Sequence, residues 1–401
     1  MLFYKFRKSK LKQLNWGVNV IYLDQAASSF PKPVEVIHAM TEVMTEYAAN
    51  PGRGGHALSM RAGSIIDRTR QAMATFFGFD HPDRVCFTSN ATAALNQAIK
   101  GLPFEKDDHV LTTSYEHNSV RRPLEYLKKT KGIHVDYVNT GETEVFDLEA
   151  FAKKITPHTK LIVVSHGSNL TGKIMPIELI GELAREQDIP FLVDAAQTAG
   201  ILPIHMTNMN IDLLAFPGHK GLLGPQGTGV LVVGKGIDLT PIHHGGTGSS
   251  SELIDQPDSL PERLESGTLN TPGIAGLLAG LTVVKAMGID SIRAHEKRLT
   301  ELLIRGLENI QFVTTYGPIT DRLGVVPFSI EGIDSHEIAI ILDQHYKIAV
   351  RAGLHCTPLG HETIGTSSQG TVRVSVGPYN TEEEIRKVIK AIEEIVDGYF
   401  G

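Results

Sequence analysis

The sequence predicts an α/β protein in which a large domain, built on a mostly parallel sheet, is followed by a smaller α/β domain. The first observation is that short β-branched runs alternate with amphipathic stretches between residues 20 and 233. Such alternation requires crossover connections, which cover both faces of a parallel sheet with helices. The second is that a shorter strand and helix pattern begins at residue 312. A chain of 401 residues, 41% of them hydrophobic, is long enough to bury a core in each domain.

The apolar periodicity places the elements of the large domain in order along the chain. Strands are expected at residues 21–23, 84–88, 109–113, 134–138, 160–165, 190–194, 211–216 and 229–233. Helices are expected at about residues 33–48, 62–77, 91–100, 119–130, 147–155 and 176–187.

Two further helical stretches, at about residues 272–286 and 290–308, lead into the second domain. Its strands are expected at residues 312–315, 324–330, 347–350 and 371–376, and its helices at about 335–345 and 381–397. Thr381, with Glu384 three residues later, forms a capping box that marks the start of the last helix. We therefore assign residues 1–19 to an N-terminal extension, 20–284 to the large domain and 285–401 to the small domain.

Composition narrows the class of protein. A formal net charge of −7 argues against a general nucleic-acid or anionic-membrane surface, so small molecules or proteins are the expected partners. The basic residues 1–19 lack the apolar core of a secretory signal, and the longest apolar run, residues 272–284, is too short to span a bilayer. The only cysteines, Cys86 and Cys356, form no disulfide framework, which favours a reducing, cytoplasmic setting. No metal site is expected.

Lys220 stands in an unusual position for a lysine. It follows the apolar run 211–216 within the turn Pro-Gly-His-Lys, before a glycine-rich connection to the next strand. An ammonium group beside buried strands loses hydration, which lowers its pKa and makes the neutral amine available to attack a carbonyl. The alternative is a solvated lysine in a hairpin turn.

Other polar residues follow neighbouring strands. Asn90-Ala-Thr opens a helix, so its N–H groups form an anion site or are simply capped by the Asn90 side chain. His117 and Asn169 lie in loops after their strands, where a surface or turn role is the alternative. Asp194 directly ends an apolar strand, where a carboxylate is costly unless it is paired with a cation or a hydrogen-bond donor.

Together these residues match the needs of one cofactor. Pyridoxal phosphate requires an amine for its aldehyde, donors for its phosphate, a flat partner for its ring and an anion beside its pyridine nitrogen. One crossover separates Asp194 from Lys220, so both fit in one pocket.

The motifs resemble those of a known family. In order they are Asn-Ala-Thr at 90–92, Glu-His at 116–117, Asn near Thr-Gly at 169–172, Val-Asp-Ala-Ala-Gln at 193–197 and Gly-His-Lys at 218–220. They are similar to class V aminotransferase-type pyridoxal-phosphate enzymes, specifically to cysteine desulfurases of the selenocysteine-lyase-like group. The resemblance covers about residues 22–379, and implies the type I fold of pyridoxal-phosphate-dependent transferases.

The resemblance implies roles around the cofactor ring. Lys220 would hold the cofactor covalently, and His117 would stack on the ring. Asp194 would pair with the pyridine nitrogen, while Asn169 and Gln197 would approach the phenolic oxygen.

It also implies a phosphate site. Ala91, Thr92 and His219 would bind the phosphate, and Thr268 would reach the phosphate of a neighbouring subunit, which implies a homodimer. The family usually has Ser or Thr two residues before this histidine, but here Pro217 offers neither a hydroxyl nor an N–H group. Phosphate binding is therefore expected to be weaker or differently arranged.

The remaining assignments concern the substrate. Arg373, in the middle of the strand at 371–376, suits a substrate carboxylate, with a solvent-facing arginine as the alternative. The resemblance adds Ala26 to the substrate site. Cys356, on a turn-rich segment, matches the sulfur-accepting cysteine of the family, whereas Cys86 reads as a small buried hydrophobe.

The resulting hypothesis is an L-cysteine desulfurase that releases alanine and leaves a persulfide on Cys356. His117 and Lys220 would carry protons, and a sulfur-acceptor protein is an expected partner. The alternatives are a selenocysteine or cysteine-sulfinate lyase, a class V aminotransferase without persulfide chemistry, and a non-enzymatic sulfur scaffold or regulatory protein.

Overall fold

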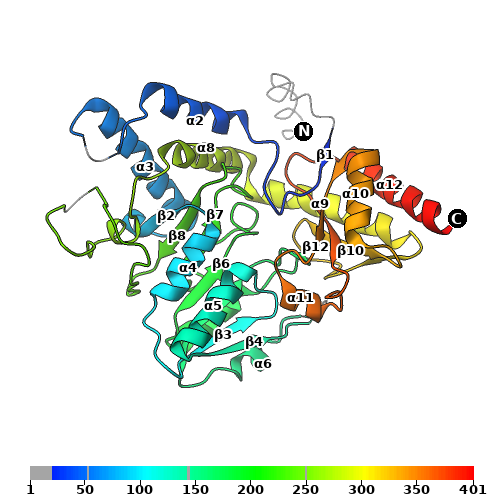
Figure 1. Cartoon of the computed structure of the whole chain (residues 1–401), viewed down its shortest axis with the longest axis horizontal. Coiled ribbons are helices and arrows are strands. Elements are labelled where there is room, and N and C mark those ends of the chain that lie inside the picture. The colour runs from blue at the N-terminus through cyan, green and yellow to red at the C-terminus, as the bar shows by residue number, and fades with distance from the viewer. Residues whose placement is uncertain (1–19, 52–53, 142–144, 249–250) are drawn as a thin grey trace.

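The computed structural model describes residues 20–51, 54–141, 145–248 and 251–401. The extension expected at residues 1–19 lies outside the described residues. The described chain forms a larger body around a seven-stranded sheet and, to its right in Figure 1, a smaller body around a four-stranded sheet.

The seven-stranded sheet is mostly parallel, as expected. In spatial order its strands are β2 (Val85–Thr88), β8 (Gly229–Val233), β7 (Leu213–Pro217), β6 (Phe191–Asp194), β5 (Thr159–Ser165), β3 (His109–Thr113) and β4 (His134–Val138). The strand β8 is antiparallel to both of its neighbours, β2 and β7, because the chain returns from β7 to β8 without a crossover helix. Buried β-branched and aromatic runs fill both faces of the sheet, which is typical of parallel strands covered by helices.

Helices cover both faces of this sheet and create two cores (Figure 1). On one face lie α3 (Ala57–Phe76), α6 (Leu148–Ala152), α7 (Ile177–Glu186) and α8 (Thr271–Met287), with α2 (Val34–Glu46) packed on α8. On the other face lie α4 (Ala91–Gly101) and α5 (Asn118–Lys131). Neighbouring strand residues point to opposite cores, as Cys86 and Phe87 do. Cys86 is fully buried, as predicted, and burial raises the pKa of its thiol.

The smaller sheet is antiparallel and packs on a core of its own. Its strands, in spatial order, are β12 (Arg351–Gly353), β13 (Thr371–Ser375), β10 (Val325–Ile330) and β9 (Val313–Thr315). The helices around it are α9 (Ile289–Glu308), α10 (Ser335–Tyr346) and α12 (Glu382–Phe400). The short helix α11 (Pro358–Thr363) meets the larger body instead, where the Thr363 hydroxyl donates to Ser114 at 3.1 Å. The predicted capping box at the start of α12 is confirmed, because Thr381 and Glu384 bond reciprocally.

Two strands differ from their sequence-based description. The first expected strand forms as β1 (Ile21–Tyr22), but it pairs with β11 (Ile348–Ala349) rather than with the seven-stranded sheet. The single strand expected at residues 347–350 is split, because the chain leaves β11 and joins β13 through β12. The N-terminal segment is thereby held beside the C-terminal body.

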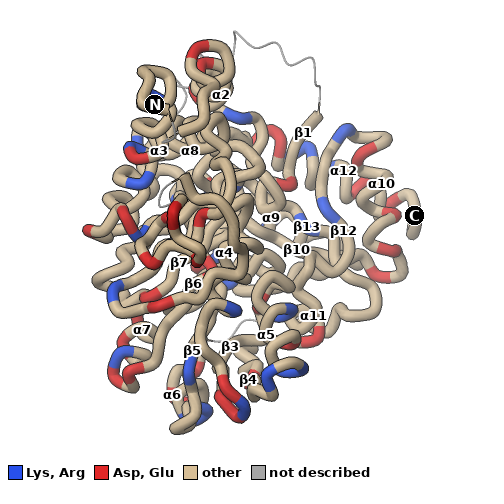
Figure 2. Tube along the Cα trace, turned by 60° about the vertical axis from the view of Figure 1, so that its left-hand side comes forward, with Lys and Arg blue, Asp and Glu red and all other residues tan. Residues whose placement is uncertain are grey.

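Exposed charges are paired along the helices. On α12, which Figure 2 shows with acidic and basic residues side by side, Lys387 pairs with Glu383 and Lys390 with Glu394. Among the described residues, no single helix meets the length and hydropathy requirements for crossing a membrane; α8 and α9 meet them only together, as a pair bent by 77°.

A buried ion pair ties the segment before α8 to the large sheet. Arg70 on α3 meets the Glu265 carboxylate with both terminal nitrogens, and the Nη1–Oε1 distance is 2.7 Å. The same carboxylate accepts the backbone N–H of Phe87 on β2. Three segments that are distant in sequence are therefore joined through one carboxylate, three residues before Thr268.

Arg70→Met is expected to lower the free energy of unfolding by about 3–5 kcal/mol, because it leaves the buried Glu265 carboxylate without its cation. Urea unfolding followed by circular dichroism measures this loss. Arg61→Met is the matched control on the same helix: it removes an exposed pairing with Glu42 and Glu46 and is expected to have little effect. Equal stability losses in the two variants would contradict the importance of the buried pair.

Candidate active site

A pocket lies at the carboxyl ends of β3, β5, β6 and β7, beside the N-terminus of α4. Ligands of parallel α/β sheets bind at this edge. Eight residues predicted for the site line the pocket: Ala91, Thr92, His117, Asn169, Asp194, Gln197, His219 and Lys220. The structure brings them together from segments far apart in the sequence.

Lys220 follows β7 on a tight turn. The turn requires glycine at position 218, because a Cβ there would lie 2.2 Å from the Thr228 hydroxyl. The Lys220 ammonium has no hydrogen bond or ion pair among the described residues. Burial, with Arg373 as a second cause, lowers its pKa to about 8. The Lys220 side chain is half-buried and lines the pocket, which differs from the solvated-turn alternative.

Asp194 ends β6 and is buried. One carboxylate oxygen accepts the N–H of Ala196 at 2.9 Å. Burial raises the pKa of Asp194 to about 6, against the opposing effects of that hydrogen bond and of Lys220. A carboxyl group in this state gains stability from a cation placed beside it.

His117 caps α5, and its ring is fixed by the next turn. Its Nδ1 accepts the backbone N–H of Ser119 at 3.1 Å, so Nε2 is the nitrogen that carries the proton in the neutral ring. Burial and the nearby Lys220 lower the pKa of His117 to about 4. The Ser119 hydroxyl continues to Thr92 at 2.7 Å, which links the His117 ring to the first turn of α4.

The first turn of α4 is capped by a side chain and also faces the pocket. The Asn90 side chain accepts the N–H of Ala93, so the N-cap is real. The N–H groups of Ala91 and Thr92 precede that bond, and both residues line the pocket. Pro217 also lines the pocket, at the position where the family usually has Ser or Thr. It supplies no hydrogen-bond donor.

His219 and its backbone are held by the N-terminal segment. Its Nδ1 lies 3.2 Å from the Ser28 hydroxyl, and burial lowers the pKa of the ring to about 4. Its carbonyl accepts hydrogen bonds from Ser29 and from the Lys32 ammonium at 2.8 Å. Burial lowers the pKa of Lys32 to about 8. The sequence analysis did not single out Lys32, because it follows a proline and does not lie at the end of an expected strand.

Arg373 is 1% exposed, so the solvent-facing alternative is wrong. Its Nη2 pairs with Asp24 at 2.8 Å, and its Nη1 donates to the Asn169 carbonyl at 2.9 Å. Its Nε has no partner among the described residues. Asp24 was missed, although it follows the apolar residues 21–23 just as Asp194 follows its own strand.

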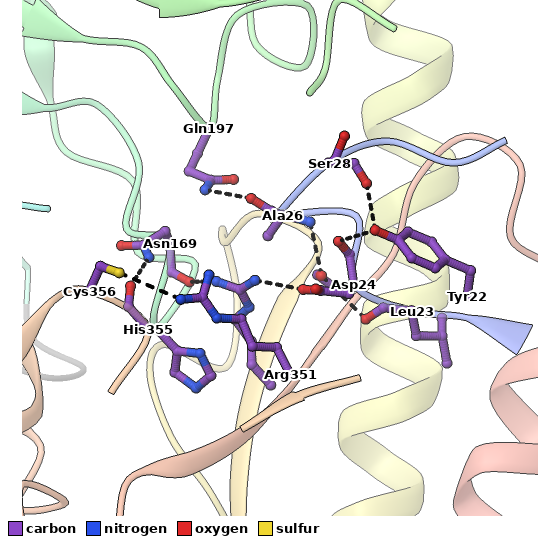
Figure 3. Close-up of polar contacts among 12 residues, drawn as sticks. Tyr22, Leu23, Asp24, Ala26, Ser28, Asn169, Gln197, Arg351, His355 and Cys356 are labelled. Carbon is purple, nitrogen blue, oxygen red and sulfur yellow. Dashed lines mark hydrogen bonds and ion pairs between the residues drawn. The ribbon is translucent and has the colours of Figure 1, made fainter. Parts of the chain in front are cut away.

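Ala26 lies beside this ion pair (Figure 3). Its N–H donates to the Ser375 hydroxyl at 3.0 Å, and its carbonyl accepts the Gln197 amide at 3.1 Å. Its neighbour Ala27 lines the pocket. The N-terminal segment is thus part of the wall around Lys220.

Cys356 lies on a turn between β12 and α11, as expected, but the turn is half-buried and anchored rather than exposed. The Asn169 amide donates to the His355 carbonyl at 2.6 Å and accepts the Thr357 hydroxyl at 2.6 Å, while the Asn118 N–H donates to the Cys356 carbonyl. Figure 3 shows Asn169 beside the Cys356 turn. Asn169 thus joins the pocket to the cysteine turn.

Two residues near Cys356 in the sequence, Arg351 and His355, have side chains that can stabilise a thiolate. Arg351 faces the sulfur, with Nη2 3.5 Å from Sγ. His355 turns away, and its Nε2 lies 3.0 Å from the Thr371 carbonyl. Burial lowers the pKa of His355 to about 2, so its ring is neutral. Arg351 is therefore the cation beside the thiol.

Thr268 does not line the pocket of its own chain. Thr268 is exposed and lies three residues after Glu265, which is held by Arg70. Its side chain is thus available to a group outside this chain.

Comparisons with known proteins agree with this geometry. The family model for class-V aminotransferases matches residues 21–388. A probable cysteine desulfurase of Pyrococcus abyssi (strain GE5 / Orsay) is 37% identical, with 94% of each chain covered. A probable cysteine desulfurase of Methanothermobacter thermautotrophicus is 36% identical, again with 94% of each chain covered.

Solved structures show the same relationship. The apo cysteine desulfurase of Thermococcus onnurineus NA1 superposes with a TM-score of 0.89 at 35% identity, covering 94% of this chain and 95% of the other. The cysteine desulfurase CsdA of Escherichia coli, at 24% identity, shows the shared fold with a TM-score of 0.87 and 98% of each chain covered. The chain therefore belongs to the class-V aminotransferase family, in the group that contains the cysteine desulfurases.

Proposed function

We propose that this protein is a pyridoxal-phosphate-dependent cysteine desulfurase that converts L-cysteine to L-alanine and a persulfide on Cys356. The observation that carries the proposal is the position of Asn169, which lines the pocket of Lys220 and also holds the turn of Cys356. The homologous cysteine desulfurases support the same activity.

The pocket fits the cofactor at each of its polar ends. Lys220 offers a pocket-lining amine for the aldehyde. The buried Asp194 carboxyl has no direct cationic partner in the part of the chain that the structure describes, and a protonated pyridine nitrogen would supply one. The open N–H groups at Ala91 and Thr92 suit a phosphate at a helix N-terminus. Pyridoxal phosphate held there by Lys220, Asp194 and the first turn of α4 would supply an electron sink for the reaction.

The protein groups would then orient the substrate and move protons. Arg373 would hold the carboxylate through its unpartnered Nε edge, beside Ala26, while Asp24 keeps the guanidinium in place. His117, which would stack on the cofactor ring, and Lys220 would transfer protons at the reacting carbon. Burial lowers the pKa of Lys220 to about 8, so neutral amine is present near neutral pH. The pKa of His117, lowered to about 4, keeps its ring neutral, with the proton on Nε2.

Cys356 would complete the sulfur transfer. Its thiolate, beside the Arg351 guanidinium, attacks the substrate sulfur. An S–S bond forms as the carbon–sulfur bond breaks, and the electron pair remains with the substrate carbon, which takes up a proton to become alanine. The thiol of the enzyme becomes a persulfide, so no external oxidant is required.

We further propose a homodimer in which Thr268 reaches the phosphate of the neighbouring subunit, since it is exposed and outside its own pocket. As the family resemblance implies, Asn169 and Gln197 would approach the phenolic oxygen of the cofactor, and His219 would bind its phosphate. A sulfur-acceptor protein would receive the persulfide sulfur in a reducing compartment such as the cytoplasm.

Lys220→Ala is expected to abolish turnover and the borohydride-reducible link to the cofactor, because the described residues that line the pocket include no other lysine. Absorbance, followed by mass spectrometry of the reduced peptides, measures this. Lys160→Ala, on the exposed side of β5, is the control and keeps both. A reduced cofactor found on a different lysine would refute the assignment.

Pro217→Ser is expected to tighten cofactor binding, because a hydroxyl at this point of the pocket can donate to the phosphate. One hydrogen bond to a charged group contributes roughly 1.5–3 kcal/mol, so the dissociation constant falls by about ten- to a hundredfold. Equilibrium titration of the apoprotein measures it, and Pro217→Ala separates loss of the ring from gain of the hydroxyl. Equal affinity in the Ser and Ala variants would show that the phosphate is satisfied elsewhere.

Cys356→Ala is expected to keep the bound cofactor and its spectral response to cysteine, since neither step uses the thiol. It should lose most cysteine desulfuration and all persulfide labelling, while selenocysteine, whose selenium leaves more readily, is still cleaved. Mass spectrometry and alanine assays measure this. Cys86→Ala is the matched control, because that thiol is fully buried in a strand. Full cysteine turnover in Cys356→Ala would move the protein to the lyase or aminotransferase alternative.

A further inference from the structure

Glu296 is a buried carboxyl group to which the reaction above gives no role. It lies on α9 and is 5% exposed. Among the described residues its carboxyl makes no hydrogen bond or ion pair, although buried polar groups normally have a partner. A Cβ placed on Gly324, the residue before β10, would lie 3.4 Å from Oε2. A lone carboxyl in such a place needs an explanation.

The explanation suggested by the structure is a second cavity behind the cofactor pocket. The cavity, of about 40 Å³, is lined by Glu296 at α9, by Ser375 and by Gln25. On its other side it is lined by Gln197 and Lys220, which also line the cofactor pocket. The Lys220 side chain therefore stands between the two spaces.

The size and lining of this cavity suit water. A site needs roughly 10–15 Å³ and several polar partners to hold one water molecule. The cavity offers that room and is far too small for the cofactor. Of the described residues that line it, Glu296 and Lys220 are the only ones with titratable side chains. Water here would connect one acid to one base.

The two groups are also matched as acid and base. In water a carboxyl and an amine differ by about six pKa units, so a proton resides on the amine. Burial raises the pKa of Glu296 to about 8 and lowers that of Lys220 to about 8. Transfer of a proton between them is therefore close to neutral in free energy, which is the condition for reversible exchange.

We propose that Glu296 is a proton-relay residue that exchanges a proton with Lys220 through water in this cavity. The Glu296 carboxylic acid gives its proton to a cavity water, which passes a proton to the Lys220 amine, leaving a carboxylate and an ammonium. The reverse transfer restores both groups, so the cycle consumes nothing. The inference rests on the proposed function, because it assigns the relay to the proton steps of Lys220.

The test uses Glu296→Gln, which keeps the shape of the side chain but cannot exchange a proton. In the holoenzyme, alanine release is expected to fall at least about tenfold in kcat, with KM unchanged. The residual rate should rise with the concentration of a small buffer such as imidazole, which does not accelerate the wild type. Glu296→Asp is expected to recover part of the rate. Glu301→Gln, on an exposed face of the same helix, is the control and leaves kcat unchanged.

Two further measurements do not depend on turnover. The infrared band of protonated carboxyls near neutral pH should be weaker in Glu296→Gln than in the wild type, because the Glu296 component is lost while that of the buried Glu116 remains. Covalent capture of pyridoxal phosphate by the apoprotein should be slower in Glu296→Gln and should become buffer-dependent. An unchanged kcat, capture rate and buffer response in Glu296→Gln would overturn the relay. If wild-type protein released no alanine, the proposed function would fail, while the infrared and capture measurements would still decide on the relay.

Discussion

The geometry of the candidate site depends on the buried guanidinium of Arg373. It joins the N-terminal segment through Asp24 to the loop after β5 through the Asn169 carbonyl. A buried cation with both partners in place is stable, but loss of either partner leaves an unpaired buried group, which costs several kcal/mol. Because the Asn169 side chain holds the Cys356 turn, this one cation also fixes the distance between the turn and the pocket.

Local patterns were sufficient for the large sheet. Its strands are apolar runs bounded by turn residues, and each polar residue that ends such a run, as Asp194 does, falls at the same edge of a parallel sheet. The convergence of Lys220 with Asp194 follows from that rule alone. The sequence therefore contained the framework of the pocket.

Long-range pairing was not accessible in the same way. β1 pairs with β11 across most of the chain, and a two-residue strand carries no signal for its partner. The split between β11 and β12 depends on which strand each segment meets, not on its own residues. Asp24 had the same local signal as Asp194, but its importance comes from Arg373, which only the folded chain places beside it.

A second buried carboxyl lies close to the pocket and is coupled electrostatically to Asp194. Glu116, just before His117, is fully buried and accepts hydrogen bonds from Thr113 and Ser165, and burial raises its pKa to about 7 with a further contribution from Asp194. The pKa of Asp194 is raised only to about 6. The charge of Asp194 is one cause of the raised Glu116 pKa, so ionisation of one carboxyl disfavours ionisation of the other. Asp194 is the one of the two that lines the pocket, where a protonated ring nitrogen would favour its carboxylate form.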